Sequence, residues 1–99
     1  MPEGLAPDTF EPHVGTRFDV RPEARSELAI ELHELTRLPP RSYGDRREPF
    51  SLVFLGPAGA PLPQGIYTMH HDALGDIDLF IVPIGPGVDG RNQYEAVFN

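Results

Sequence analysis

The chain has 99 residues, with 12 Pro, 10 Gly and no Cys, and its 15 acidic and 8 basic residues give a net charge of −7. The length predicts one domain, the density of Pro and Gly excludes a helical bundle, and the lack of Cys excludes disulfides, thiolate metal sites and thiol catalysis. The negative charge opposes binding to nucleic acid or to an anionic membrane surface.

The N-terminal part of the chain carries weak structural signals. Residues 1–8 are polar and contain two Pro and one Gly, so we expect a flexible arm there, followed by a single domain over residues 9–99. Residues 9–14 are compatible with one short helical turn. Residues 16–20 alternate between polar and apolar side chains, which predicts a first short strand.

No targeting or membrane segment is expected from the sequence. The first residues lack the basic and apolar regions of a signal peptide. The longest apolar run, residues 79–84, is far shorter than the roughly 20 residues that cross a bilayer as a helix. We therefore expect a cytoplasmic protein, or one that is delivered without a cleaved signal.

Residues 26–35 fit two periodicities. Leu28, Ile30 and Leu32 alternate with polar or small residues, as in a half-buried strand. Leu28, Leu32 and Leu35 also recur at helical spacing, so a helix is the alternative. We favour the strand, because a short all-β domain needs a partner strand at this point.

The C-terminal half predicts a series of strands. Residues 50–55 are apolar on both faces, as expected of a central strand. Residues 66–71 and 76–84 predict a hairpin whose turn, residues 72–75, ends in a left-handed Gly. This turn would place Asp72 opposite Asp76 and His70 opposite Asp78. With a last strand over residues 93–98, the pattern predicts an all-β antiparallel barrel or sandwich of about six strands.

Some apolar side chains of these strands would point away from the core. They occur on both strands of the predicted hairpin and on the strand that precedes it: Ile66, Phe80, Val82, Val53 and Leu55. Either the rest of the domain covers them, or they meet another chain. If the last strand lies at the edge of a sheet, it could also extend the sheet of a partner.

Candidate chemistry is confined to the hairpin. His70 and His71 are adjacent on a strand and would point to opposite faces, so they cannot both bind one metal ion without a bulge. Asp72, Asp76 and Asp78 could supply oxygen ligands, but the segment lacks a known calcium-loop pattern. The short basic cluster of Arg41, Arg46 and Arg47 has acidic neighbours and fits a solvated loop. We assign no catalytic residue, no cofactor and no metal ligand.

Several motifs resemble those of a family of small bacterial domains of unknown function. They are Pro-Phe-Ser-Leu-Val-Phe at 49–54, Leu-Pro-Gln-Gly-Ile-Tyr at 62–67, Leu-Phe-Ile-Val-Pro-Ile-Gly at 79–85 and Tyr-Glu-Ala-Val-Phe-Asn at 94–99, with Phe-Glu-Pro-His-Val-Gly at 10–15 and Phe18. The resemblance covers most of the chain and is weakest over residues 21–48. Ile66 stands where the family pattern has Thr, and His70 where it has Glu, which argues against a special role for His70. The resemblance implies a structural or assembly role, as in phage-tail-collar-like proteins.

Two hypotheses of function follow from the sequence. The first is a structural or interaction module that packs into a homo-oligomer or a larger, phage-tail-like assembly, with a protein partner or a second copy as its only partner. The second is a protein or minor enzyme that binds a small molecule or a divalent metal ion through residues 70–78.

Overall fold

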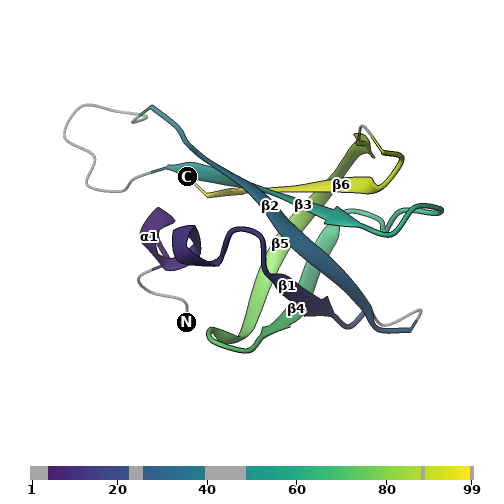
Figure 1. Cartoon of the computed structure of the whole chain (residues 1–99), viewed down its shortest axis with the longest axis horizontal. Helices are drawn as coiled ribbons and strands as arrows, with labels where there is room; N and C mark the ends of the chain where they lie inside the picture. The colour runs from purple at the N-terminus through teal and green to yellow at the C-terminus, as the bar shows by residue number, and fades with distance from the viewer. Residues whose placement is uncertain (1–4, 23–25, 40–48, 88, 99) are drawn as a thin grey trace.

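The chain folds into a closed antiparallel β-barrel, as a computed structural model of residues 5–22, 26–39, 49–87 and 89–98 shows (Figure 1). A short helix α1 (Pro7–Phe10) and a 3-10 turn η1 (Glu11–His13) precede the barrel. The six strands are β1 (Arg17–Val20), β2 (Leu28–Arg37), β3 (Phe50–Gly56), β4 (Gly65–His71), β5 (Gly75–Pro86) and β6 (Asn92–Phe98). Their order around the barrel is β1-β2-β3-β6-β5-β4, and β4 closes it by pairing with β1. The predicted fold class is therefore confirmed.

The ambiguous segment is a strand. β2 buries Ile30 and Leu32 and exposes Ala29 and His33, the alternation of a half-buried strand. β2 pairs with β1 on one side and with β3 on the other. α1 begins at Pro7, and its residues Pro7 and Phe10 are buried.

Over most of its length the last strand does not lie at a sheet edge. β6 pairs with β3 over its whole length and with β5 from Asn92 to Glu95. The expectation that it lies at the edge of a sheet is therefore wrong from Asn92 to Glu95, where closure of the barrel pairs the strand on both sides. From Ala96 to Phe98 it is paired with β3 alone.

The β4–β5 hairpin forms as predicted, but its register differs by two residues. His71 pairs with Gly75 and His70 with Asp76, so the predicted pairs of Asp72 with Asp76 and His70 with Asp78 are wrong. The reason is that the ring of His71, not Asp72, fixes the turn: its Nδ1 accepts the backbone N–H groups of Ala73 at 3.0 Å and Leu74 at 3.2 Å. Because each partner moves by an even number of residues, the predicted inner and outer faces are unchanged.

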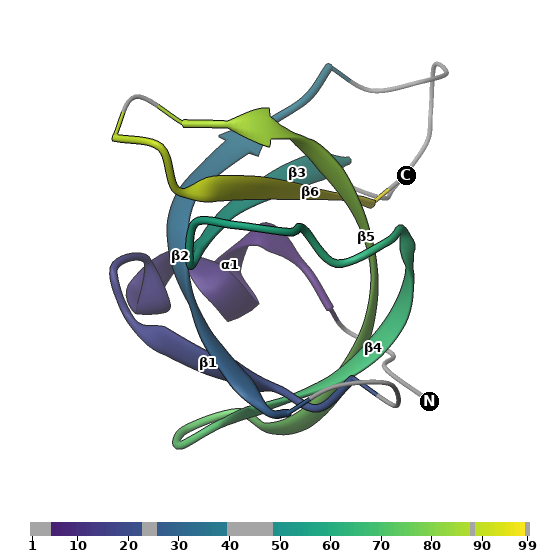
Figure 2. The same ribbon diagram turned by 90° about the vertical axis from the view of Figure 1, so that its right-hand side faces the viewer.

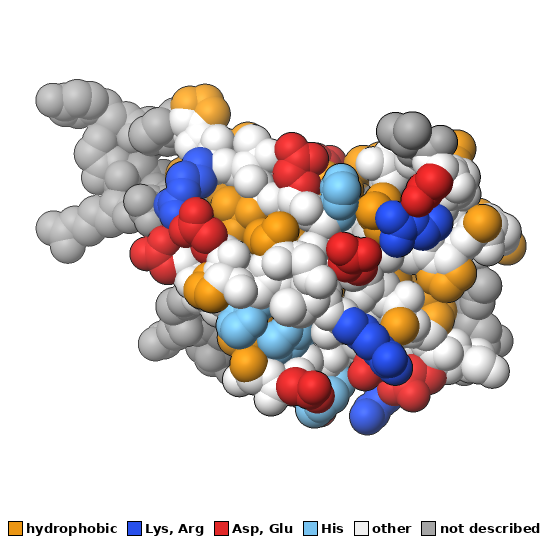
Figure 3. Space-filling view, in the orientation of Figure 1, with side chains coloured by type: hydrophobic (Ala, Val, Ile, Leu, Met, Phe, Trp, Pro, Cys, Tyr) orange, Lys and Arg blue, Asp and Glu red, His pale blue; other side chains and the backbone are white. Residues whose placement is uncertain are grey.

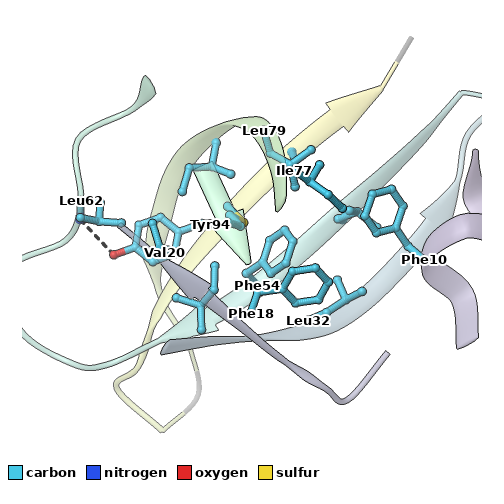
Figure 4. Close-up of a cluster of buried hydrophobic side chains, with 14 of the residues drawn as sticks. Phe10, Phe18, Val20, Leu32, Phe54, Leu62, Ile77, Leu79 and Tyr94 are labelled. Atoms are coloured by element: carbon cyan, nitrogen blue, oxygen red, sulfur yellow. Dashed lines mark hydrogen bonds between the residues drawn. The ribbon is translucent and has the colours of Figure 1, made fainter. Parts of the chain in front are cut away.

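Large side chains fill the barrel (Figure 4). One end is closed by Phe10 of α1, whose ring lies 6.0 Å from that of Phe50 and 5.8 Å from that of Phe98. Figure 2 looks along the barrel and shows α1 across its far end. Toward the other end, the buried Tyr94 hydroxyl accepts the backbone N–H of Leu62 at 3.0 Å (Figure 4). The core thus spans the barrel and accounts for the inward apolar residues of every strand.

Candidate interaction surface

A pair of large apolar side chains lies on the outer face of the β4–β5 hairpin. Ile66 and Phe80 are cross-strand partners, and their neighbours Met69, Leu79 and Ile81 point into the barrel. Ile66 is 72% exposed and Phe80 is 51% exposed. Directly opposed side chains on one face of a sheet are in reach of each other, so these two form a joint apolar surface.

The exposed apolar side chains are concentrated on this side of the molecule. In the described ranges, five large hydrophobic residues are strongly exposed: Val14, Ile66, Phe80, Ile84 and Val97. Four of the five lie on β4, β5 and β6, and Val97 is 51% exposed. Single exposed apolar residues are ordinary on protein surfaces, but a contiguous group of them marks an interaction site.

The structure places the predicted interaction residues on β4, β5 and β3, with β6 between the last two strands. Val82 pairs with Glu95, and Glu95 pairs with Val53, so both valines flank one carboxylate on adjacent strands, and both are half-buried. Leu55 is only 7% exposed and offers little surface. Val97 pairs with Ser51 of β3 on the outer side and was missed from the sequence. In the sequence, Val97 alternates with Ala96 and Phe98, and this alternation would have identified Val97 as an outward-facing residue. We call Ile66, Phe80, Val82, Val97 and Val53 the outer apolar face.

The acidic end of the hairpin continues the same outer face toward the turn. The Thr68 hydroxyl donates to Asp78 Oδ1 at 2.7 Å, and His70 Nδ1 lies 2.9 Å from Asp76 Oδ1. Asp72 Oδ1 is 3.8 Å from His70 Nε2. Over the residues described, no group of three or more His, Asp or Glu side chains is placed to hold a metal ion. The polar contacts here are surface pairs within one hairpin.

His71 lies on the inner face and is fully hydrogen-bonded. Its Nδ1 accepts two backbone N–H groups, so Nε2 carries the proton and donates it to Thr16 Oγ1 at 2.9 Å. The Thr16 hydroxyl in turn donates to the backbone oxygen of His13 at 2.6 Å. The neutral tautomer of His71 is therefore fixed by three contacts.

The surroundings of His71 disfavour its charged form. Burial, and then the nearby ring of His13 at a centroid distance of 4.7 Å, hold the pKa of His71 below its usual value. Its ring also lies 4.5 Å from that of Phe18 in the core. His71 thus has a structural role, because it links the hairpin turn to Thr16, directly before β1. These contacts give no support for a role in metal binding.

The side of the barrel formed by β1 and β2 has a different surface. There Arg17 pairs with Asp19, and Arg37 pairs with both Asp8 and Glu11. On the face of the molecule seen in Figure 3, blue Arg side chains lie beside red carboxylates. The predicted basic cluster of Arg41, Arg46 and Arg47 lies outside the described residues.

Comparison with known proteins shows the family to which this barrel belongs. The chain is a member of the domain of unknown function DUF6916, whose family model matches residues 5–98. Comparison with curated proteins and with solved structures finds no significant match. No helix among the described residues is both long and apolar enough to span a membrane. The expected resemblance to a family of unknown function is therefore confirmed.

Proposed function

We propose that this domain is an interaction module that docks another protein chain through its outer apolar face and so joins a larger assembly. The observation that carries the proposal is the cross-strand pair of Ile66 and Phe80, exposed by 72% and 51% on a barrel whose core is already complete. A phage-tail-like assembly is one setting for such a module.

The energetic reason is the cost of leaving this surface in water. Burying one large aliphatic or aromatic side chain contributes about 1.5–3 kcal/mol when it is fully removed from solvent. Because Ile66, Phe80 and Val97 are all more than half exposed, a partner that covers them would gain the larger part of that amount from each. A few such residues at the centre of an interface commonly supply most of its binding free energy.

The second hypothesis, a small-molecule or metal site at residues 70–78, has less support. The contacts of His70 with Asp76 and of Thr68 with Asp78 are those of cross-strand pairs on an exposed surface. Each is worth less than about 1 kcal/mol to the fold. Neither contact needs a ligand to explain it.

Site-specific photo-crosslinking in cells of the native host tests the proposal. A photo-reactive amino acid at position 66 should form a discrete adduct with another protein chain. The same amino acid at position 29, an exposed site on β2 away from the outer apolar face, should form none. Equal adducts at both positions, or none at position 66, would contradict an interface on this face.

A further inference from the structure

We propose that the chain docked on the outer apolar face is a different protein, which presents apolar side chains flanked by Arg or Lys, and not a second copy of this domain. This inference rests on the proposed function. It is carried by the distribution of charge around the face.

Arg and Lys are absent from the strands that form the face. The sequence contains no Arg or Lys from Pro49 to Gly90, and none after Arg91. The residues that border the apolar side chains are instead acidic: Asp78 and Asp76 follow Phe80 toward the turn, and Glu95 lies between Val82 and Val53.

No described arginine neutralises these carboxylates, and the partner of Asp76 is a histidine, His70, whose Nδ1 lies 2.9 Å from Asp76 Oδ1. Over the described ranges, every arginine forms an ion pair elsewhere: Arg17 with Asp19, Arg21 with Glu27, Arg37 with Asp8 and Glu11, and Arg91 with Asp89 and Glu31. No described arginine comes within ion-pair distance of Asp76, Asp78 or Glu95. Among the described residues, the face therefore combines apolar side chains with two carboxylates, those of Asp78 and Glu95, that have no ion-pair partner.

A second copy is a poor occupant of such a face. In a two-fold dimer the same patch meets itself, so Asp78 and Glu95 would be brought close to carboxylates of the other copy. Like charges placed opposite each other across an interface oppose binding, while opposite charges favour encounter and fix the partner. The acidic border thus selects against self-pairing and in favour of a partner with a basic rim.

Two double variants separate the apolar contribution from the charge contribution. Ile66→Thr/Phe80→Thr removes the apolar pair and keeps β-forming residues. Asp78→Asn/Glu95→Gln removes two charges, and the amide oxygen at position 78 can still accept the Thr68 hydroxyl bond. Val14→Thr, at an exposed apolar residue preceding β1, is the matched control. Unchanged circular dichroism and melting temperature show that each variant is folded.

The experiment has two parts. Sedimentation velocity of the full chain at low and high salt should show a monomer. Affinity capture from host lysate, followed by mass spectrometry and a binding titration with the purified companion, should give a protein with an Arg- or Lys-rich surface. Its affinity should fall at least about tenfold with Ile66→Thr/Phe80→Thr. With Asp78→Asn/Glu95→Gln it should fall several-fold and become less dependent on salt, while Val14→Thr changes nothing.

Failure of the inference and failure of the proposed function give different results. A wild-type dimer that Ile66→Thr/Phe80→Thr dissociates would make a second copy the occupant, which overturns the inference and keeps the proposed function. A companion whose binding needs Ile66 and Phe80 but is unchanged by Asp78→Asn/Glu95→Gln would overturn only the inference that the partner has a basic rim. If every companion binds the Ile66→Thr/Phe80→Thr variant as well as the wild type, the proposed function itself is wrong.

Discussion

Both faces of the β4–β5 hairpin carry large apolar side chains, yet the fold explains those of only one face. On the inner face Met69, Ile77 and Leu79 pack into the core. On the outer face Ile66 and Phe80 are similar in size and hydrophobicity but remain 72% and 51% exposed. Comparison of the two faces separates residues that the barrel needs for stability from residues that it carries for another purpose.

The closed barrel makes this distinction unusually clear. In an open sandwich, a second layer could cover the outer side of a hairpin. Here the strands close on themselves, α1 covers one end, and the buried side chains form one hydrophobic cluster. An apolar residue on the outside of β4 or β5 therefore has no place in the core to which it could turn.

The largest loss of stability is expected from a substitution on the inner face of the hairpin, and it tests the comparison between the two faces. Leu79→Ala removes a side chain that is almost completely buried, so we expect a loss of about 2–5 kcal/mol in the free energy of unfolding. Chemical denaturation measures this loss. Phe80→Ala, one residue away on the outer face, should cost less than about 1 kcal/mol. Similar losses for the two variants would mean that Phe80 belongs to the core and would remove the basis of the proposed interface.

Much of the fold was predictable from short-range patterns. The alternation in residues 26–35 identified β2, and the two-residue period of residues 66–71 and 76–84 identified the inner and outer faces of the hairpin. The hairpin register was not predictable, because it depends on the ring of His71, which contacts Thr16, a residue directly before β1 and distant in sequence. Local turn rules favour Asp at the start of a turn and do not anticipate a buried histidine in that role.

The second prediction concerns His71, the polar member of the inner face. The pKa of this group is lowered in the folded protein, whereas the unfolded chain binds a proton at the ordinary value of 6.5. The unfolded state therefore binds more protons than the folded state below this pH. We expect the free energy of unfolding to be steady above about pH 6.5 and to fall as the pH is lowered through the range below it.

His71→Phe isolates this contribution. The variant keeps a ring beside Phe18 but cannot accept the N–H groups of Ala73 and Leu74. We expect it to lose about 1–3 kcal/mol at neutral pH and to show a flatter decline on acidification, measured by urea unfolding across pH. His33→Gln, at an exposed histidine of β2, should keep the wild-type decline. An unchanged decline in His71→Phe would assign the pH dependence to other groups.

Only part of the candidate interaction surface could be predicted from the sequence: which residues point outward, but not how far they are exposed. Ile66 and Phe80 were identified because alternation alone places them outside. The small exposure of Leu55 was not foreseen, because it depends on how neighbouring strands cover the outer side of β3. Exposure of outward residues is set by the curvature of the barrel and by side chains from other strands, and a single strand pattern contains neither.

The smallest expected effect concerns Gly75, which helps to determine which residues face inward. Gly75 has a φ of +77° and pairs with His71. An alanine there would hold a side chain in the left-handed region at a cost of roughly 1–2 kcal/mol, although its Cβ would meet no neighbouring atom within 4 Å. Gly65→Ala is the matched control, because Gly65 has no positive φ and its Cβ would make ordinary contacts with Tyr67. It should be neutral or slightly stabilising.

Thermal unfolding compares the two glycine variants, and a nuclear Overhauser contact between Ile66 and Phe80 reports the register in each. We expect Gly75→Ala to melt at a lower temperature and to keep this contact. A register shift by one residue would exchange the inner and outer faces and expose Leu79, which costs far more than the strain at one residue. If Gly75→Ala melts at the same temperature as Gly65→Ala, the turn does not depend on a left-handed residue. The observed pairing of β4 with β5 would then be maintained by the core and by His71 alone.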